Sequence, residues 1–189
     1  MRTSLLALLG SIVYATARYH VFMGVSWSDW PIYTLNKALA LSALFVLALS
    51  VIRQCSVTGH SDARALQMAS VFGAMHVMLS LILLSPVYYE KLFVQGRLTA
   101  AAGLSMVLGA VAATAMAAGR ELRGEQRRDG GIGSLAMAAL VVGLHAMLQG
   151  FRGWLSPSQW PGMMPPLTLI AFLLGLAAVA VAVCPKRAA

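Results

Sequence analysis

Six apolar segments, each close to the length needed to cross a lipid bilayer, dominate this chain of 189 residues. A membrane-spanning helix needs about 20 predominantly apolar residues. The segments run approximately over residues 3–20, 31–52, 65–85, 98–118, 133–155 and 165–183. Because unpaired backbone groups are too costly in lipid, each segment is expected to form a helix rather than an open strand.

The composition agrees with this pattern. Only 11% of the residues are charged and 59% are hydrophobic, whereas a soluble domain carries about 25% charged residues. We therefore predict an all-α, polytopic membrane bundle of six helices that forms one domain over residues 1–189. The net charge of +8 does not indicate a nucleic-acid partner, since most basic residues lie beside apolar segments, where they meet lipid headgroups.

The distribution of basic residues predicts the orientation in the membrane. The denser face would carry Arg2, Arg53, Arg64, Arg120, Arg123, Arg127, Arg128, Lys186 and Arg187. The other face would carry Arg18, Lys37, Lys91, Arg97 and Arg152, together with all four tryptophans, Trp27, Trp30, Trp154 and Trp160. Positive charge gathers on the cytoplasmic side, and tryptophan gathers at membrane interfaces. Both termini are thus expected in the cytoplasm of a bacterial-type inner membrane.

The first apolar segment has two interpretations. Arg2 followed by an apolar run and Ala15-Thr16-Ala17 is also typical of a cleavable signal peptide. We expect a retained helix.

Two histidines, His76 and His145, lie near the middle of the third and fifth segments. In helices that run in the same direction, both would lie about 17 Å from the cytoplasmic end. An ionisable side chain inside a membrane helix is a functional candidate by default. Two axial imidazoles would hold one six-coordinate b-type haem suited to electron transfer. The alternative is that each histidine simply bonds a carbonyl of a neighbouring helix.

Other residues near the pair suit a haem. Gly73 and Gly143 permit close approach of a flat ring. Lys37 and Arg152 are candidates to pair with the haem propionates, with Gln149 in the same network. Arg152 follows His145 by seven residues, which places both on one face of a continuous helix. The alternative for the two cations is an interaction with the outer headgroups. His20, at the outer end of the first segment, is a candidate for an outer metal site, although a water-exposed interfacial histidine is the commoner situation.

The stretch from Arg64 to His76, Arg-Ala-Leu-Gln-Met-Ala-Ser-Val-Phe-Gly-Ala-Met-His, resembles the third helix of the ferric reductase-like transmembrane domain superfamily. Single-haem members of that superfamily include the STEAP metalloreductases and the MsrQ-type haem subunits. The resemblance implies six helices, cytoplasmic termini and ligation of one haem b by His76 and His145.

We therefore predict a membrane-embedded b-type cytochrome subunit. No G-x-G-x-x-G motif follows a strand-like run, so electrons would come from a quinol or a separate donor protein, with Arg120–Arg128 as a docking surface. With such a partner the chain would be the haem subunit of an oxidoreductase. Whether it is part of an enzyme therefore depends on that partner. The alternative is a haem-free accessory subunit of a larger membrane complex.

Overall fold

The computed structural model describes residues 2–55, 63–82, 92–121 and 131–184, with the side chains of residues 119–121 excepted. Six α-helices form most of the chain. They are α1 (Arg2–Thr16), α2 (Leu35–Cys55), α3 (Ala63–Ile82), α4 (Ala100–Glu121), α5 (Ile132–Gly150) and α6 (Leu167–Val183). With their flanking turns, all six are long and apolar enough to cross a membrane. The predicted all-α bundle of six apolar helices is confirmed in this respect.

Several boundaries differ from the sequence-based expectation. The first helix changes at Ala17 to a π-helical turn, Ala17–Phe22, and a second such turn, Trp30–Thr34, leads into α2. The fourth helix begins at Ala100 rather than at residue 98, because strands β1 (Phe93–Val94) and β2 (Arg97–Leu98) form a short hairpin before it. The backbone of Gln95 and Gly96 has positive φ there, which closes a tight turn.

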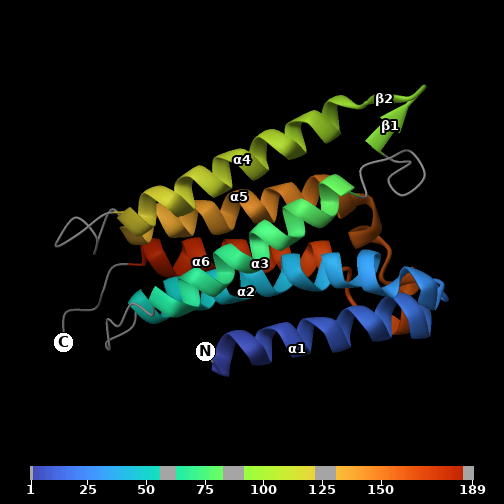
Figure 1. Ribbon diagram of the computed structural model, residues 1–189, viewed down its shortest axis with the longest axis horizontal. Helices are drawn as coiled ribbons and strands as arrows, with labels where there is room; N and C mark the ends of the chain where they lie inside the picture. The colour runs from blue at the N-terminus through green and yellow to red at the C-terminus, as the bar shows by residue number, and fades with distance from the viewer. Residues whose placement is uncertain (1, 56–62, 83–91, 122–130, 185–189) are drawn as a thin grey trace.

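The helices run alternately up and down (Figure 1). The start of α1 and the end of α6 lie at the same end of the bundle. The opposite end carries the turns between α1 and α2 and those between α5 and α6, which include η6 (Phe151–Leu155), η7 (Pro157–Gln159) and η8 (Pro161–Met163). All four tryptophans lie in these turns, as expected for residues of one interface.

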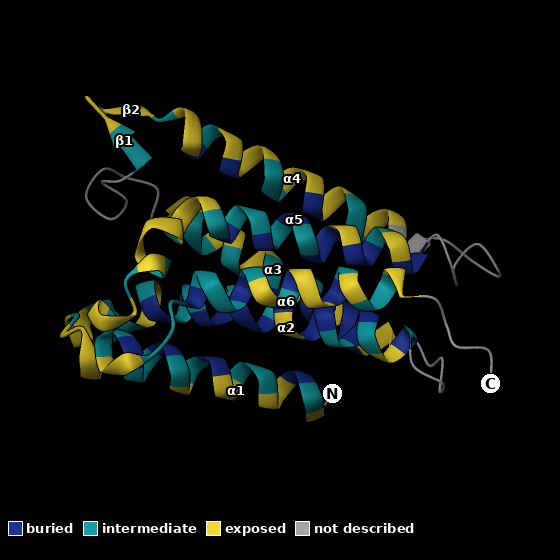
Figure 2. Cartoon of the chain, turned by 180° about the vertical axis from the view of Figure 1, so that it is seen from behind, coloured by how far each residue is buried: buried dark blue, intermediate teal, exposed yellow. Residues whose placement is uncertain are grey.

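Helix α2 lies at the centre and contacts α1, α3, α5 and α6. Its buried residues Leu44 and Leu47 belong to the main core together with Leu135 and Ala139 of α5. Figure 2 shows the buried positions along α2 and α5 and the exposed positions on the outer helices. Because small residues face each other, α5 and α6 approach closely: a Cβ added to Gly175 would stand 2.6 Å from the carbonyl oxygen of Ala139.

The outward faces of α3 and α4 are apolar. Val77, Met78, Leu104 and Val107 are each more than half or about half exposed. Soluble monomers rarely show such continuous apolar surface. In a bilayer these side chains meet the acyl chains, which agrees with a multi-pass membrane protein.

Side-chain hydrogen bonds close the tryptophan-bearing end. The Tyr14 hydroxyl donates to the carbonyl of Pro165 at 2.7 Å, and Arg18 donates to the carbonyl of Met164. The indole of Trp154 donates to Thr168 at 2.9 Å. These bonds tie α1 and α5 to the start of α6, since each satisfies a polar group that lipid cannot.

Candidate functional site

His76 of α3 is oriented by Asn36 of α2. The Nδ1 atom of His76 lies 2.7 Å from Oδ1 of Asn36 and 3.2 Å from the carbonyl oxygen of the same residue. Both oxygens can only accept a hydrogen bond. Nδ1 therefore carries the hydrogen, and the neutral ring keeps the lone pair on Nε2.

His145 of α5 has the same arrangement with Ser105 of α4. Its Nδ1 lies 2.9 Å from the carbonyl oxygen of Ser105 and 2.9 Å from the hydroxyl oxygen. The carbonyl oxygen only accepts, so Nδ1 again donates and Nε2 again keeps the lone pair. The alternative considered from the sequence, a histidine bonded to a neighbouring helix, is thus realised at one nitrogen of each ring.

The Nε2 atoms are accessible. No side chain or carbonyl in the described part of the chain bonds Nε2 of His76 or of His145. Within that part, Ser4 Oγ and Gln54 Nε2 are the buried side-chain atoms that lack a partner, so neither imidazole Nε2 is sealed in the protein. Both nitrogens can therefore reach a further ligand.

The two histidines occupy the same position along their helices. Each histidine follows the first residue of its helix by 13 positions, or about 20 Å along the axis. Within the described ranges, however, α3 packs against α2 and marginally against α1, and it makes no extensive contact with α5.

The number and type of side chains available as ligands limit which kind of metal centre this region could bind. The described residues contain no group of three or more histidine, cysteine or carboxylate side chains that could hold a metal ion. A bare zinc ion takes four ligands, three or more of them from protein. A haem iron already has four porphyrin nitrogens and needs only axial ligands from the protein. Two imidazoles would meet, in number and kind, the need of a haem iron for axial ligands, whereas they are too few for a zinc ion.

Two of the predicted polar residues lie beside this pair. The amide of Gln149 donates to the Ser105 hydroxyl at 2.7 Å, so Gln149 belongs to the network of His145. The Lys37 ammonium lies 4.3 Å from the centre of the Tyr33 ring and 5.4 Å from that of Tyr19. Lys37 follows Asn36 directly, which places a cation next to the residue that orients His76.

Arg152 differs from expectation. Helix α5 ends at Gly150, and Arg152 lies exposed in the following 3-10 turn. The continuous helix that would place Arg152 on the face of His145 is therefore not formed, because the chain leaves α-helical geometry at Gly150, where φ is −139°. Its predicted contact with a propionate stays a prediction without that geometry.

The two predicted glycines are explained by helix packing. A Cβ on Gly143 would stand 3.3 Å from Cα of Phe172 on α6. A Cβ on Gly73 would stand 4.0 Å from that of Ala43 on α2. Their role beside a flat ring stays a prediction.

His20 contrasts with the other two histidines. It is 5% exposed, not water-exposed as one interpretation had it. Its Nδ1 donates to the carbonyl of Val25 at 2.8 Å, and its Nε2 accepts from the Thr34 hydroxyl at 2.6 Å. The ring also stacks on Trp27 at 4.7 Å. Both nitrogens are occupied, so His20 is unsuited to the outer metal site considered from the sequence.

Asn36, Ser80 and Ser105 were not predicted as site residues. The chain spacing could have indicated Asn36 and Ser105, because His76 and His145 each follow their partner on the preceding helix by 40 residues. The predicted docking residues of the loop between α4 and α5 lie outside the described side chains.

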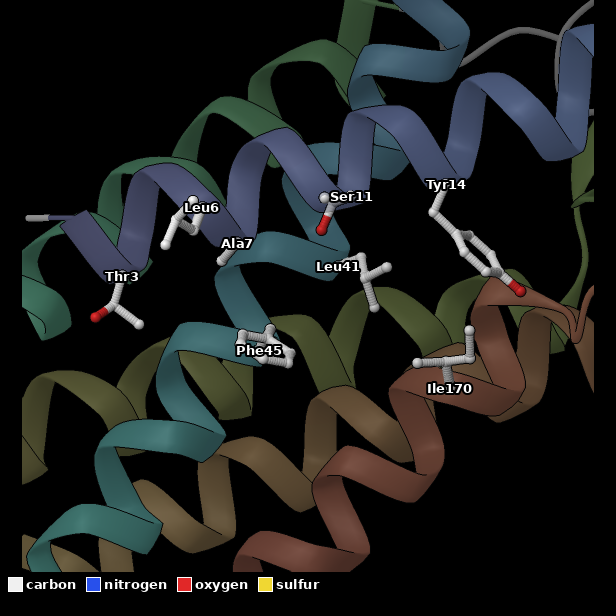
Figure 3. A pocket seen from close by; sticks show the side chains of 9 residues that line it. Thr3, Leu6, Ala7, Ser11, Tyr14, Leu41, Phe45 and Ile170 are labelled. Atoms are coloured by element: carbon white, nitrogen blue, oxygen red, sulfur yellow. The ribbon is translucent and has the colours of Figure 1, made fainter.

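A cavity of about 350 Å³ lies elsewhere, between α1, α2 and α6 (Figure 3). Leu6, Leu41, Phe45 and Ile170 line it, and Tyr14 stands at one end. Neither His76 nor His145 lines this cavity. It is apolar and separate from the histidine pair.

Comparisons with protein-family models, with curated proteins and with solved structures found no match to this chain.

Proposed function

We propose that this chain is a membrane b-type cytochrome subunit, ferric reductase-like, that transfers electrons through one haem held by His76 and His145. The supporting observation is that Nδ1 of each ring donates to an oxygen that can only accept. Both Nε2 lone pairs are thereby available, each 13 positions after the first residue of its helix.

The chain's own residues would bind and tune the group. A carbonyl that accepts from Nδ1–H fixes the ring orientation and makes Nε2 a better donor to a metal. Haem supplies reversible one-electron chemistry, and occupation of both axial positions by imidazole favours electron transfer over the binding of small molecules. The side chains then supply ligands, depth and surrounding charge.

Lys37 is the better placed of the two predicted cations. It lies next to Asn36 in the chain, the residue whose side chain bonds His76. The faces of Tyr33 and Tyr19 hold it in place. We assign it to a haem propionate, because a partly desolvated charge pair is strong.

The remaining parts of the proposal concern the setting. The chain would lie in a bacterial-type inner membrane with both termini in the cytoplasm, and other membrane subunits would be compatible with its apolar surface. A quinol or a separate electron-donor protein would reduce it. With such a partner, it would act as the haem subunit of an oxidoreductase.

The test is a reduced-minus-oxidised spectrum of the full chain, purified in detergent and titrated with haemin. We expect a sharp α-band typical of a b-type cytochrome. The band should disappear in His76→Ala and in His145→Ala. His60→Ala is the matched control, because His60 lies between apolar segments, and it should keep the band. A wild-type protein that stays colourless while remaining folded would refute the proposal.

The second candidate is a haem-free accessory subunit of a larger membrane complex. The observation in its favour is that each histidine already links two helices through Nδ1. Such links stabilise a helical hairpin without a cofactor. A colourless protein in which both alanine variants lower the unfolding temperature would favour this candidate.

A further inference from the structure

The arrangement around each histidine occurs twice in the chain at a constant offset. Adding 69 to the numbers of Asn36, His76 and Ser80 gives Ser105, His145 and Gln149. The same offset relates identical apolar residues on both hairpins. These pairs are Leu35 and Leu104, Leu39 and Leu108, Ala43 and Ala112, Leu66 and Leu135, Ala69 and Ala138, and Met78 and Met147. The helix pair α2–α3 thus corresponds to the helix pair α4–α5 at these positions.

The local contacts repeat as well. The residue four positions after each histidine bonds the same side chain that the histidine does. The Asn36 amide donates to Ser80 Oγ at 3.0 Å, and the Gln149 amide donates to Ser105 Oγ at 2.7 Å. Residues four apart lie one above the other on a helix. Each orienting side chain is therefore held from two successive turns of the histidine-bearing helix.

Burial separates these contacts from incidental surface bonds. Asn36 and Ser105 are each 2% exposed. A buried polar side chain inside a membrane is costly unless it is hydrogen-bonded. Each one bonds a histidine and the polar residue four positions after that histidine. Removing either side chain would leave these partners with unsatisfied polar groups.

We propose that Asn36 and Ser105 are the positioning residues of two equivalent half-sites, which hold His76 and His145 in the tautomer whose Nε2 faces one shared ligand. This inference rests on the proposed function for the identity of that ligand, haem. Neither Asn36 nor Ser105 would touch the iron. Each acts through its histidine.

The two half-sites differ at the following residue. Lys37 of the first corresponds to Met106 of the second. A cation therefore accompanies one imidazole and not the other. Lys37 would therefore be the residue of the first half-site that pairs with an anionic substituent of the shared ligand.

The hydrogen-bond acceptors that each histidine keeps after substitution of its partner determine how strongly that substitution should disturb it. Without the Asn36 side chain, Nδ1 of His76 keeps only the carbonyl at 3.2 Å. Without the Ser105 hydroxyl, Nδ1 of His145 keeps a carbonyl at 2.9 Å. Asn36→Leu should therefore disturb its histidine more than Ser105→Ala does.

The first experiment needs no haem. The full chain, with ¹⁵N-labelled imidazole rings and reconstituted in nanodiscs, is examined by ¹⁵N NMR, which distinguishes protonated from unprotonated ring nitrogens. We expect both His76 and His145 with the hydrogen on Nδ1. Asn36→Leu should convert the His76 signal to a mixture of tautomers, while Asn36→Ser, which installs the residue of the other half-site, should retain it.

Ser50→Ala is the control, because Ser50 lies on α2 and, among the residues that the structure describes, bonds the carbonyl of Val46 in its own helix and neither histidine. It should leave both histidine signals unchanged. An unchanged His76 tautomer in a folded Asn36→Leu protein would overturn the positioning role. So would a wild-type protein with the hydrogen on Nε2 of either ring.

The second experiment adds haemin to the same proteins. Loss of an orienting partner typically weakens metal retention about 10- to 100-fold, and we expect a loss in that range for Asn36→Leu. Its reduction potential should rise, since a less basic imidazole stabilises the ferric state less. Asn36→Ser should restore both values.

The outcomes separate the two proposals. If the wild-type protein binds no haem but shows the expected tautomers, the proposed function fails and the half-site geometry stands. If haem binds and Asn36→Leu changes neither tautomer nor retention, the positioning role alone is refuted.

Discussion

The Lys37 ammonium lies 4.3 Å above the ring of Tyr33, and the Tyr19 ring stands on another side at 5.4 Å. A cation over an aromatic face gains about 0.5 to 2 kcal/mol, more when it is desolvated. The two tyrosine rings thereby limit how freely the lysine can extend to the headgroups. Lys37 also follows Asn36 directly in the chain, and on this basis we propose it as the partner of an anionic ligand.

Lys37→Met tests this assignment, because it installs the residue found at the equivalent position of the second half-site. Loss of a positive charge near the iron destabilises the reduced form relative to the more positive oxidised form. The reduction potential should therefore fall, with the b-type spectrum retained. A potentiometric titration measures it, and Lys37→Arg, which keeps the charge, serves as the control. An equal potential in the methionine variant and the wild type would contradict the assignment.

Imidazole rescue tests ligation separately from folding. His76→Gly removes the ring and leaves space for a free imidazole on α3. The low-spin spectrum should be lost in this variant and return when imidazole is added in millimolar excess. His145→Gly should behave in the same way. If added imidazole restores nothing in either folded variant, the two rings are not axial ligands.

Gly175→Ala should destabilise the bundle. The new Cβ would stand 2.6 Å from the Ala139 carbonyl oxygen, a backbone atom that cannot move aside without separating α5 from α6. We expect a loss of about 1 to 3 kcal/mol, seen as a lower unfolding temperature in detergent. Gly109→Ala is the control, because a Cβ there meets nothing within 4 Å, and alanine favours a helix over glycine. A Gly175→Ala protein as stable as the control would mean that α6 packs differently.

Topology can be tested by fusion at the C-terminus. The excess of basic residues predicts a cytoplasmic C-terminus. A fused green fluorescent protein should therefore fluoresce in a bacterial host, and a fused alkaline phosphatase should be inactive. The reverse pattern would place the tryptophan-bearing end in the cytoplasm.

Long apolar runs were sufficient to predict the helices. Hydropathy sets how much chain the bilayer can hold, so α2, α3 and α6 appear within a few residues of their expected bounds. Details at helix ends depended on local backbone geometry instead. The π-helical turn Ala17–Phe22 and the 3-10 turn Phe151–Leu155 are examples, and the second of these moved Arg152 away from its expected face.

For the histidines, too, some features could be predicted from the sequence and others could not. Their depth was predicted from position in the chain, and each lies 13 positions after the first residue of its helix. Their hydrogen bonds depend on the register between neighbouring helices, which hydropathy does not encode. For this reason Asn36 and Ser105 were missed as partners, and His20, expected at the water interface, is buried between Val25 and Thr34.

The contact between α2 and α5 has a mechanical consequence. Helix α3 depends mainly on α2, and among the larger contacts of the described residues α4 packs on α5 alone. The separation of the two imidazoles therefore depends on how α2 is held against α5, both directly and through α6, which packs against both helices. A ligand bound by both histidines would link the helix pair α2–α3 to the helix pair α4–α5. Its binding free energy would therefore add to the free energy of unfolding of the protein.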